Sequence, residues 1–354
     1  MPPRGPLEQL LRLVRPRWLA RHKRTTLANR RGPVTHVILL DGTMSSLEEG
    51  DETNIGLIYK LLTERAGVAL SVYYEAGIQW TRWSNTLDVL MGRGINRQIS
   101  RAYGYLASRY RPGDRIFLMG YSRGAYAVRS LAGVIDKVGL LRAEEATERN
   151  VQQAYRLYQT PNAGEACAVF HRLHCHAGVE IEMIGAFDTV KSLGLRLPWI
   201  WKLAEAHHAF HNHHLSACVR SGFHALALEE TRSVYAPVLW QSDPDWHGRL
   251  EQVWFAGTHG DVGGQLGGLR AARGLSNLPL VWMLGQAELR GLPLPSGWRA
   301  RFPGDVEAPS VGQWRGTAKF FLLRKPRLVG ADPSERLHDT ALARGTIPTH
   351  RQMA

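Results

Sequence analysis

Short apolar runs alternate with helical patterns over most of the chain, and this alternation constrains the fold more than any other feature. Five runs have the length and the β-branched or aromatic content of buried strands: 34–40, 69–74, 115–119, 179–187 and 252–256. The spacing of apolar residues predicts helices at 55–64, 95–110, 123–135, 143–160, 202–228 and 278–290. Strands that alternate with helices form parallel sheets with both faces covered. We therefore predict an α/β fold with a mostly parallel sheet and helices on both faces.

The same pattern predicts how the chain is divided. With 354 residues, the chain is long enough for one large catalytic domain, which we place at 34–292. The interval 192–250 is long for a single crossover, so we expect a helical lid or cap insertion there. After 292 the periodicity weakens, and we expect 293–354 to form an extension packed on the surface of the domain.

Residues 1–33 form a basic N-terminal arm in this division. Its first 31 residues carry nine arginines or lysines against one acid, Glu8, and the whole chain has a net charge of +13. A basic arm is attracted to anionic surfaces, so peripheral contact with an anionic membrane is one expected partner. Two structures stay open for it, a disordered segment and a short amphipathic helix that ends near Pro16. No basic–aromatic motif accompanies the charge, so we do not expect a nucleic-acid partner.

The compartment is predicted from features that the chain lacks. No run approaches the roughly 18 apolar residues of a spanning helix, and the start has no secretory signal pattern. Three cysteines, Cys167, Cys175 and Cys218, cannot form a disulfide framework. We expect synthesis in the cytoplasm, with no transmembrane segment, and any secretion would proceed without a signal peptide.

The segment Gly120-Tyr121-Ser122-Arg123-Gly124 is the sharpest local motif. A G-x-S-x-G sequence that follows a strand and opens a helix is typical of a nucleophile elbow. The glycines are needed because the strained serine backbone requires strand and helix to approach each other closely. We predict that Ser122 is a catalytic nucleophile; a plain turn with a helix-capping serine is the alternative.

A nucleophilic serine needs a base and an acid, and two other predicted strands end in suitable residues. Asp188 follows the fourth run and His259 follows the fifth. Catalytic groups collect at the carboxyl ends of parallel strands, and the order Ser, Asp, His is that of α/β-hydrolases. We predict His259 as base and Asp188 as acid. Asp261 competes as the acid, and His224 and His338 are the alternative bases.

The oxyanion hole of such a site needs two N–H donors. One is expected to be the amide of Arg123, directly after the nucleophile. The second is expected from the turn after the first strand, from the amide of Gly42 or Thr43. Asp41 precedes this turn; we expect it to support the elbow or orient the loop, and we do not include it in the triad.

Seven spaced motifs together resemble one known family. They are Leu39–Thr43, Thr53–Asn54, Gly113–Leu118, Gly120–Tyr126, Phe187–Val190, His224–Glu230 and Val253–Gly264. The chain is similar, from about 34 to 290, to an uncharacterised α/β-hydrolase domain family that includes type VI secretion phospholipase effectors. The resemblance implies an α/β-hydrolase fold and a Ser122-Asp188-His259 ester hydrolase. It also implies phospholipid substrates, delivery into rival cells, and a secretion-system or immunity partner. One departure is Tyr121, where the family usually has phenylalanine.

Two further features remain outside this scheme. Histidines cluster at 207–214 and 171–176, but no zinc-binding sequence pattern accompanies them, so we expect no metal and no cofactor. An apolar, aromatic segment at 195–203 is either a lid that meets lipid or ordinary core. We therefore predict a serine hydrolase that cleaves carboxylic esters, in particular phospholipid or other lipid esters. The alternative is a catalytically silent, hydrolase-like module that docks on anionic membranes or a secretion partner.

Overall fold

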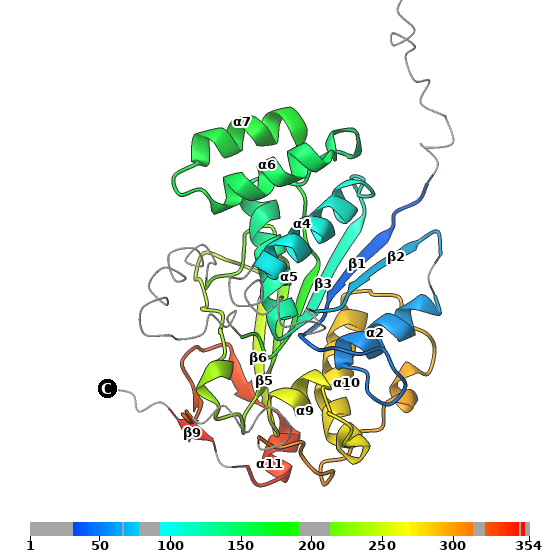
Figure 1. Ribbon diagram of the computed structural model, residues 1–354, viewed down its shortest axis with the longest axis vertical. Helices are drawn as coiled ribbons and strands as arrows, with labels where there is room; N and C mark the ends of the chain where they lie inside the picture. Colours follow the sequence, from blue (N-terminus) through cyan, green and yellow to red (C-terminus); the bar gives the residue numbers. More distant parts are fainter. Residues whose placement is uncertain are drawn as a thin grey trace, which may run out of the picture. The chain divides into compact units, whose positions relative to one another are not determined.

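A parallel sheet of seven strands, in the order β2-β1-β3-β4-β5-β6-β8, runs through the structure (Figure 1). The structure is a computed structural model that describes residues 31–65, 67–77, 93–190, 213–313, 323–346 and 348–350. The strands are β1 (Thr35–Leu40), β2 (Leu70–Glu75), β3 (Arg115–Tyr121), β4 (Met183–Phe187), β5 (Ser221–Ala227), β6 (Arg249–Phe255) and β8 (Glu335–Leu337). Residues Val34–Ala354 form one compact unit.

Helices cover both faces of this sheet, as the sequence predicted. On one face lie α2 (Asn54–Thr63), α9 (His259–Gly263) and α10 (Arg273–Leu289). On the other lie α4 (Arg93–Ala107) and α5 (Arg123–Lys137), with α6 (Glu148–Gln159) and then α7 (Gly164–His174) stacked outside them. The predicted α/β fold class is confirmed.

The side chains of β3 show why the strand sequences are apolar without alternation. Phe117 and Met119 join the core between the sheet and α2 and α10. Ile116 and Leu118 join the core between the sheet and α4 and α5. All four side chains are fully buried, and each such burial contributes about 1.5–3 kcal/mol to folding.

Strand β5 corrects one prediction. The Ala- and Leu-containing segment 202–228 reads as a helix, but Ser221–Ala227 form a central strand between β4 and β6. Phe223, Ala225 and Ala227 face the α10 side, whereas His224 is satisfied by polar partners within the fold. The backbone pairing available between two preformed strands outweighs the helical propensity of this segment.

The helix predicted at 143–160 is also shorter than expected. It begins at Glu148, because the Thr147 hydroxyl caps it by accepting a hydrogen bond from the Asn150 amide. Residues Ala143–Glu145 form a separate 3₁₀ turn. Further 3₁₀ turns lie at Ser233–Tyr235, Arg270–Ala272 and Trp298–Arg301.

Residues after 292 do more than pack on the surface, which corrects the prediction for this region. Strand β8 pairs with β6 and extends the main sheet. The short strands β7 (Leu328–Val329) and β9 (Thr349–His350) pair with each other, and α11 (Asp339–Ala343) follows β8. The sequence periodicity missed these elements because each is too short to show a repeat.

Several predictions fall outside the described residues. The basic arm is one, except for residues 31–33, and the apolar segment at 195–203 and most of the later histidine cluster are others. The lid stays a prediction for 191–212, while 213–250 contains β5 and connecting segments. In the part of the chain that the structure describes, no helix has the length and hydropathy needed to cross a bilayer.

Candidate active site

The turn at Ser122 joins β3 to α5 and holds the serine in an unusual backbone conformation. Its φ is 56° and its ψ is −117°, a region that costs a non-glycine residue free energy. A Cβ on Gly120 would lie 2.5 Å from the Gly124 carbonyl carbon, and one on Gly124 would lie 2.0 Å from the Leu40 carbonyl oxygen. Both glycines are therefore required by close backbone approaches.

We expect Gly124→Ala to destabilise the protein by about 1–3 kcal/mol, because the methyl group meets rigid backbone. Gly164→Ala is the matched control: a Cβ there has nothing within 4 Å, so stability should change by less than about 1 kcal/mol. Urea unfolding of both variants measures the difference. Equal free energies of unfolding for the two variants would show that the backbone around Ser122 can accommodate the added methyl group.

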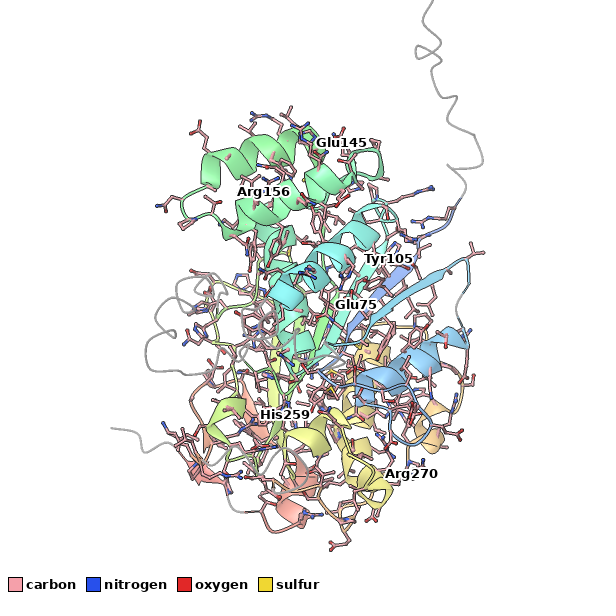
Figure 2. The ribbon with its side chains drawn as sticks, in the orientation of Figure 1. Glu75, Tyr105, Glu145, Arg156, His259 and Arg270 are labelled. Atoms are coloured by element: carbon pink, nitrogen blue, oxygen red, sulfur yellow. The ribbon has the colours of Figure 1, made fainter. Side chains whose placement is uncertain are left out.

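Ser122, Asp188 and His259 meet at the carboxyl edge of the sheet, where they follow β3, β4 and β6. Figure 2 labels His259 at the start of α9. His259 Nδ1 lies 2.5 Å from Asp188 Oδ2, and His259 Nε2 lies 2.9 Å from Ser122 Oγ. With Asp188 ionised, Nδ1–H donates to the carboxylate, which leaves Nε2 to accept the serine proton. The three residues are 7%, 0% and 4% exposed in chain order, so bulk water does not screen them.

Two tyrosine rings pack against the imidazole of His259. Tyr235 stacks on it at 4.5 Å with an interplanar angle of 18°, and Tyr121 lies at 4.9 Å and 34°. The His259 amide donates to Glu230 Oε2 at 3.2 Å. These contacts fix the plane of the ring. Sequence reasoning missed Tyr235, which no motif marks, whereas Glu230 ends one of the motifs behind the family resemblance.

Arg327 is the partner of Asp188 that the sequence did not reveal. Its two terminal nitrogens donate to Asp188 Oδ1 and Oδ2 at 2.6 and 2.9 Å. Burial alone would raise the pKa of Asp188, but Arg327 and the hydrogen bond from His259 outweigh it and hold that pKa well below its usual range. Arg327 comes from the C-terminal region, and nothing in the sequence distinguishes it from the chain's many other arginines.

Asp261, the alternative acid, has a different set of contacts. Its Oδ2 accepts hydrogen bonds from the Thr258 amide and hydroxyl and from the Ser310 hydroxyl, and its Oδ1 accepts one from the Val311 amide. It caps the start of α9 and anchors residues 310–311. The structure brings Asp188, and not Asp261, to the imidazole of His259.

The two candidate loop donors for an oxyanion differ in their contacts. The Gly42 amide donates to Asp41 Oδ1 at 2.7 Å, so it is already used. The loop is held by Gln265, whose Nε2 donates to the Thr43 carbonyl at 2.9 Å. Of the two loop amides, that of Thr43 therefore remains the candidate donor, together with the Arg123 amide at the start of α5.

Asp41 is buried below the loop and holds it in place. Its carboxylate accepts hydrogen bonds from the Thr53 hydroxyl at 2.6 Å and the Tyr74 hydroxyl at 2.9 Å, besides the Gly42 amide. These contacts tie Asp41 to the loop, and none of them involves His259. Burial raises the pKa of Asp41 to about 6, although all three donors favour the ionised form.

This raised pKa predicts a pH dependence of stability. Its folded value of about 6 exceeds the ordinary value of 3.8, so the stabilisation is complete below about pH 4 and is lost as the pH rises through 6. Between pH 4 and pH 8 the free energy of unfolding should fall by about 3 kcal/mol relative to Asp41→Asn. Urea unfolding at both pH values measures this. A pH-independent difference between the two proteins would contradict the raised pKa.

The two alternative histidines are structural. His224 Nε2 accepts a hydrogen bond from the Thr189 amide at 3.0 Å, and burial lowers the pKa of His224 to about 3. His338 stacks on Phe255 at 4.4 Å and caps α11. Neither is the imidazole that contacts Ser122.

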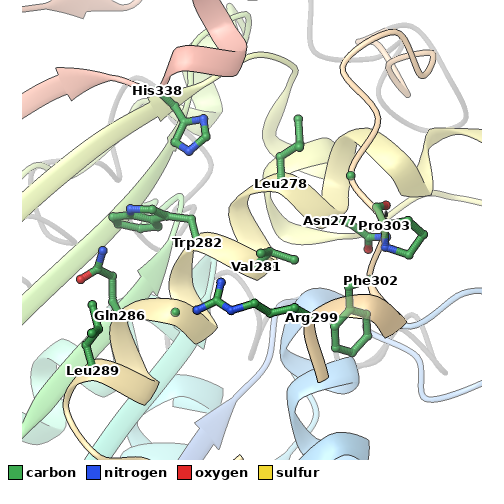
Figure 3. A pocket seen from close by; sticks show the side chains of 12 residues that line it. Asn277, Leu278, Val281, Trp282, Gln286, Leu289, Arg299, Phe302, Pro303 and His338 are labelled. Atoms are coloured by element: carbon green, nitrogen blue, oxygen red, sulfur yellow. Dashed lines mark hydrogen bonds between the residues drawn. The ribbon is translucent and has the colours of Figure 1, made fainter. Parts of the chain in front are cut away.

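A hollow of about 540 Å³ lies along α10 (Figure 3). Its walls come from α10, from the segment around Arg299 and Phe302, and from His338. None of the three triad residues lines it. The candidate active site is therefore defined by its polar contacts and not by this hollow.

Comparison with known proteins gives a family match. The model of the T6SS phospholipase effector Tle1-like catalytic domain matches residues 35–286. An uncharacterised protein of Saccharomyces cerevisiae is 30% identical over 188 residues, which are 45% of this chain and 27% of the yeast protein. The chain therefore corresponds to about a quarter of the length of that relative.

Two solved structures are also similar. A crystal structure of an uncharacterised protein from Pseudomonas aeruginosa has a TM-score of 0.41 and 17% identity, over 83% of this chain and 51% of that chain. The structure of the Tle1 effector bound to the VgrG spike of the type VI secretion system has a TM-score of 0.28 and 15% identity. That match covers 66% of this chain and 51% of the effector chain.

Proposed function

Because the chain belongs to the family of type VI secretion Tle1-like phospholipase effector catalytic domains, we propose that it is a serine hydrolase of lipid carboxylic esters. The observation that carries this proposal is the continuous hydrogen-bonded path from Ser122 Oγ through His259 to Asp188. The family supports a lipid substrate, and the path supports the serine mechanism. Phospholipids are the substrates we propose first.

In the proposed reaction, Ser122 Oγ attacks the ester carbonyl while His259 Nε2 takes the serine proton. The tetrahedral intermediate collapses, and the same imidazole returns the proton to the leaving alkoxide. A water molecule then attacks the acyl-serine, with His259 again as the base, and the fatty acid leaves. Asp188 keeps the imidazole in the correct tautomer and stabilises the imidazolium through both acyl transfers.

The negative oxygen of the intermediate is stabilised by amides. We assign this role to the amides of Arg123 and Thr43, because the Gly42 amide already donates to Asp41. The Arg123 amide also lies at the positive end of the α5 dipole. Each such donor lowers the barrier by about 3 kcal/mol in a site that excludes water.

A fluorophosphonate probe and a panel of lipids test the proposal together. The probe should form an adduct that mass spectrometry locates on Ser122, and the purified protein should release fatty acid from phospholipid micelles. Labelling at another residue would refute the assigned nucleophile. Hydrolysis of short-chain p-nitrophenyl esters alone would indicate a soluble ester as the substrate.

We further propose that the protein acts as an effector of a type VI secretion system, with a secretion partner and an immunity partner. This proposal rests on the family alone. The competing non-enzymatic function is docking on anionic membranes. Vesicle binding by the full chain without any ester turnover would favour docking, and loss of that binding in a chain lacking 1–31 would assign it to the basic arm.

A further inference from the structure

Arg123 carries a guanidinium group that is mostly buried and has no hydrogen-bond or ion-pair partner within the described residues. The residue is 8% exposed. Elsewhere around the imidazole, each buried arginine has its own acid: Arg327 pairs with Asp188, and Arg232 pairs with Glu230 at 2.6 Å. Within the described residues, the side chain of Arg123 makes neither a hydrogen bond nor an ion pair. The Arg327–Asp188 and Arg232–Glu230 pairs are each neutral, so the positive charge of Arg123 is left in excess.

Arg123 adjoins the reacting groups along the chain and interacts electrostatically with a ring that packs against one of them. Arg123 directly follows Ser122, and its charge acts on Tyr235, whose ring stacks on His259. Ser122, which caps α5, makes no side-chain capping bond, so the amides at this helix end are not satisfied by that side chain. Burial lowers the pKa of Arg123, in contrast to Arg232, whose pKa is raised by its pairing with Glu230 despite burial.

A buried cation without a counter-charge is costly, and a bound anion removes that cost. The guanidinium fork suits phosphate, to which it can donate two parallel hydrogen bonds. The positive end of the dipole of the 15-residue helix α5 adds to the positive potential at the same place. The unpaired guanidinium therefore favours an anionic ligand next to the nucleophile.

We propose that Arg123 is a specificity-determining residue that binds the phosphate of the lipid whose ester Ser122 attacks. In a glycerophospholipid the ester carbonyl and the phosphorus are separated only by the glycerol carbons and the two linking oxygens. A phosphate on an ester held at Ser122 thus comes within reach of the long side chain of the next residue. This inference rests on the proposed ester hydrolysis and adds the group that selects the substrate.

The test compares two substrates with identical acyl chains, a zwitterionic phosphatidylcholine and the corresponding diacylglycerol, in neutral detergent micelles. Neutral micelles remove the general attraction of a basic protein to an anionic surface. The wild type should prefer the phosphatidylcholine. Arg123→Gln should lower the ratio of kcat/KM values, phosphatidylcholine over diacylglycerol, by about 100-fold, and Arg123→Lys should fall between the two.

Arg129→Gln is the matched control, because Arg129 lies on the same helix and donates to the Val238 carbonyl. The Arg129→Gln variant should have the same ratio of kcat/KM values, phosphatidylcholine over diacylglycerol, as the wild type. Unfolding adds a second readout: because Arg123 has no hydrogen-bond or ion-pair partner within the described residues, Arg123→Gln should be no less stable than the wild type without substrate. A clear loss of stability would assign Arg123 a structural role and overturn the proposal.

The kinetic outcomes separate this inference from the proposed function. If the wild type hydrolyses neither lipid, ester hydrolysis of lipids fails and the inference fails with it. If the wild type hydrolyses both lipids but Arg123→Gln keeps the same ratio, only the role of Arg123 is overturned. If Arg123→Gln lowers kcat/KM by the same factor on both lipids, phosphate recognition by Arg123 is likewise contradicted.

Discussion

Replacement of Ser122 by alanine should abolish ester hydrolysis, with a loss of about 10⁶-fold in kcat. The hydroxyl lies 2.9 Å from His259 Nε2, and alanine removes the attacking atom without adding bulk. The fold should be retained, because the serine side chain makes no helix-capping bond. Fatty-acid release from micelles and thermal unfolding measure the two effects.

A comparison of single and double variants separates a loss of catalysis from a loss of folding. Residues of one catalytic unit are strongly non-additive, so Ser122→Ala combined with His259→Ala should be no slower than Ser122→Ala alone. If the two losses add, the residues act independently. Substantial activity in Ser122→Ala at wild-type stability would refute the proposed nucleophile.

Removal of Arg327 should produce the largest loss of stability. In Arg327→Met the fully buried carboxylate of Asp188 keeps, among the described residues, the hydrogen bonds from His259 and the Ala227 amide. Breaking a buried ion pair by deleting one partner typically costs about 3–5 kcal/mol, because the other charge is left uncompensated. We expect a loss of this size in urea unfolding at pH 7, together with weakened ester hydrolysis.

A double-mutant cycle tests whether this loss comes from the pair. Combining Arg327→Met with Asp188→Asn removes both charges, so the double variant should be more stable than the sum of the single losses predicts. Arg327→Lys keeps the positive charge but loses the bidentate hydrogen bond to Asp188. Its stability should lie between those of the wild type and Arg327→Met. Strict additivity would show that Arg327 contributes by packing alone.

The same ion pair predicts how stability responds to acid. Because Arg327 and His259 outweigh the effect of burial, the pKa of Asp188 in the folded protein lies below the ordinary 3.8. A depressed carboxyl pKa stabilises the fold above about pH 4, and this stabilisation is lost as the pH falls further. Arg327→Met should therefore lose less stability on acidification than the wild type does.

The contacts of Asp188 and His259 bring together residues from several regions of the chain. Asp188 is oriented by Arg327 from the C-terminal region, and the imidazole is held by Tyr235 from the segment after β5. Arg123, in contrast, has no such partner within the described residues. This difference in pairing among Arg327, Arg232 and Arg123 is the basis for the proposed preference for a phosphate-bearing ester.

The sequence by itself determined the class of the fold and the elbow. Apolar runs and helical spacing are local properties, so β1, β3, α2 and α5 could be read within a few residues of their observed bounds. The same holds for Ser122, Asp188 and His259, because each follows a recognisable strand. Parallel strands end at one edge of a sheet, so the proximity of these residues followed from their order along the chain.

Tertiary structure alone decided the rest. Strand β5 is built from residues that favour a helix, and only pairing with β4 and β6 makes it a strand. The choice between Asp188 and Asp261 depended on which carboxylate reaches the imidazole, and both follow strands in the sequence. Arg327 contacts an aspartate 139 residues earlier. No local pattern encodes such a contact, because packing of distant segments, and not propensity, brings the two charges together.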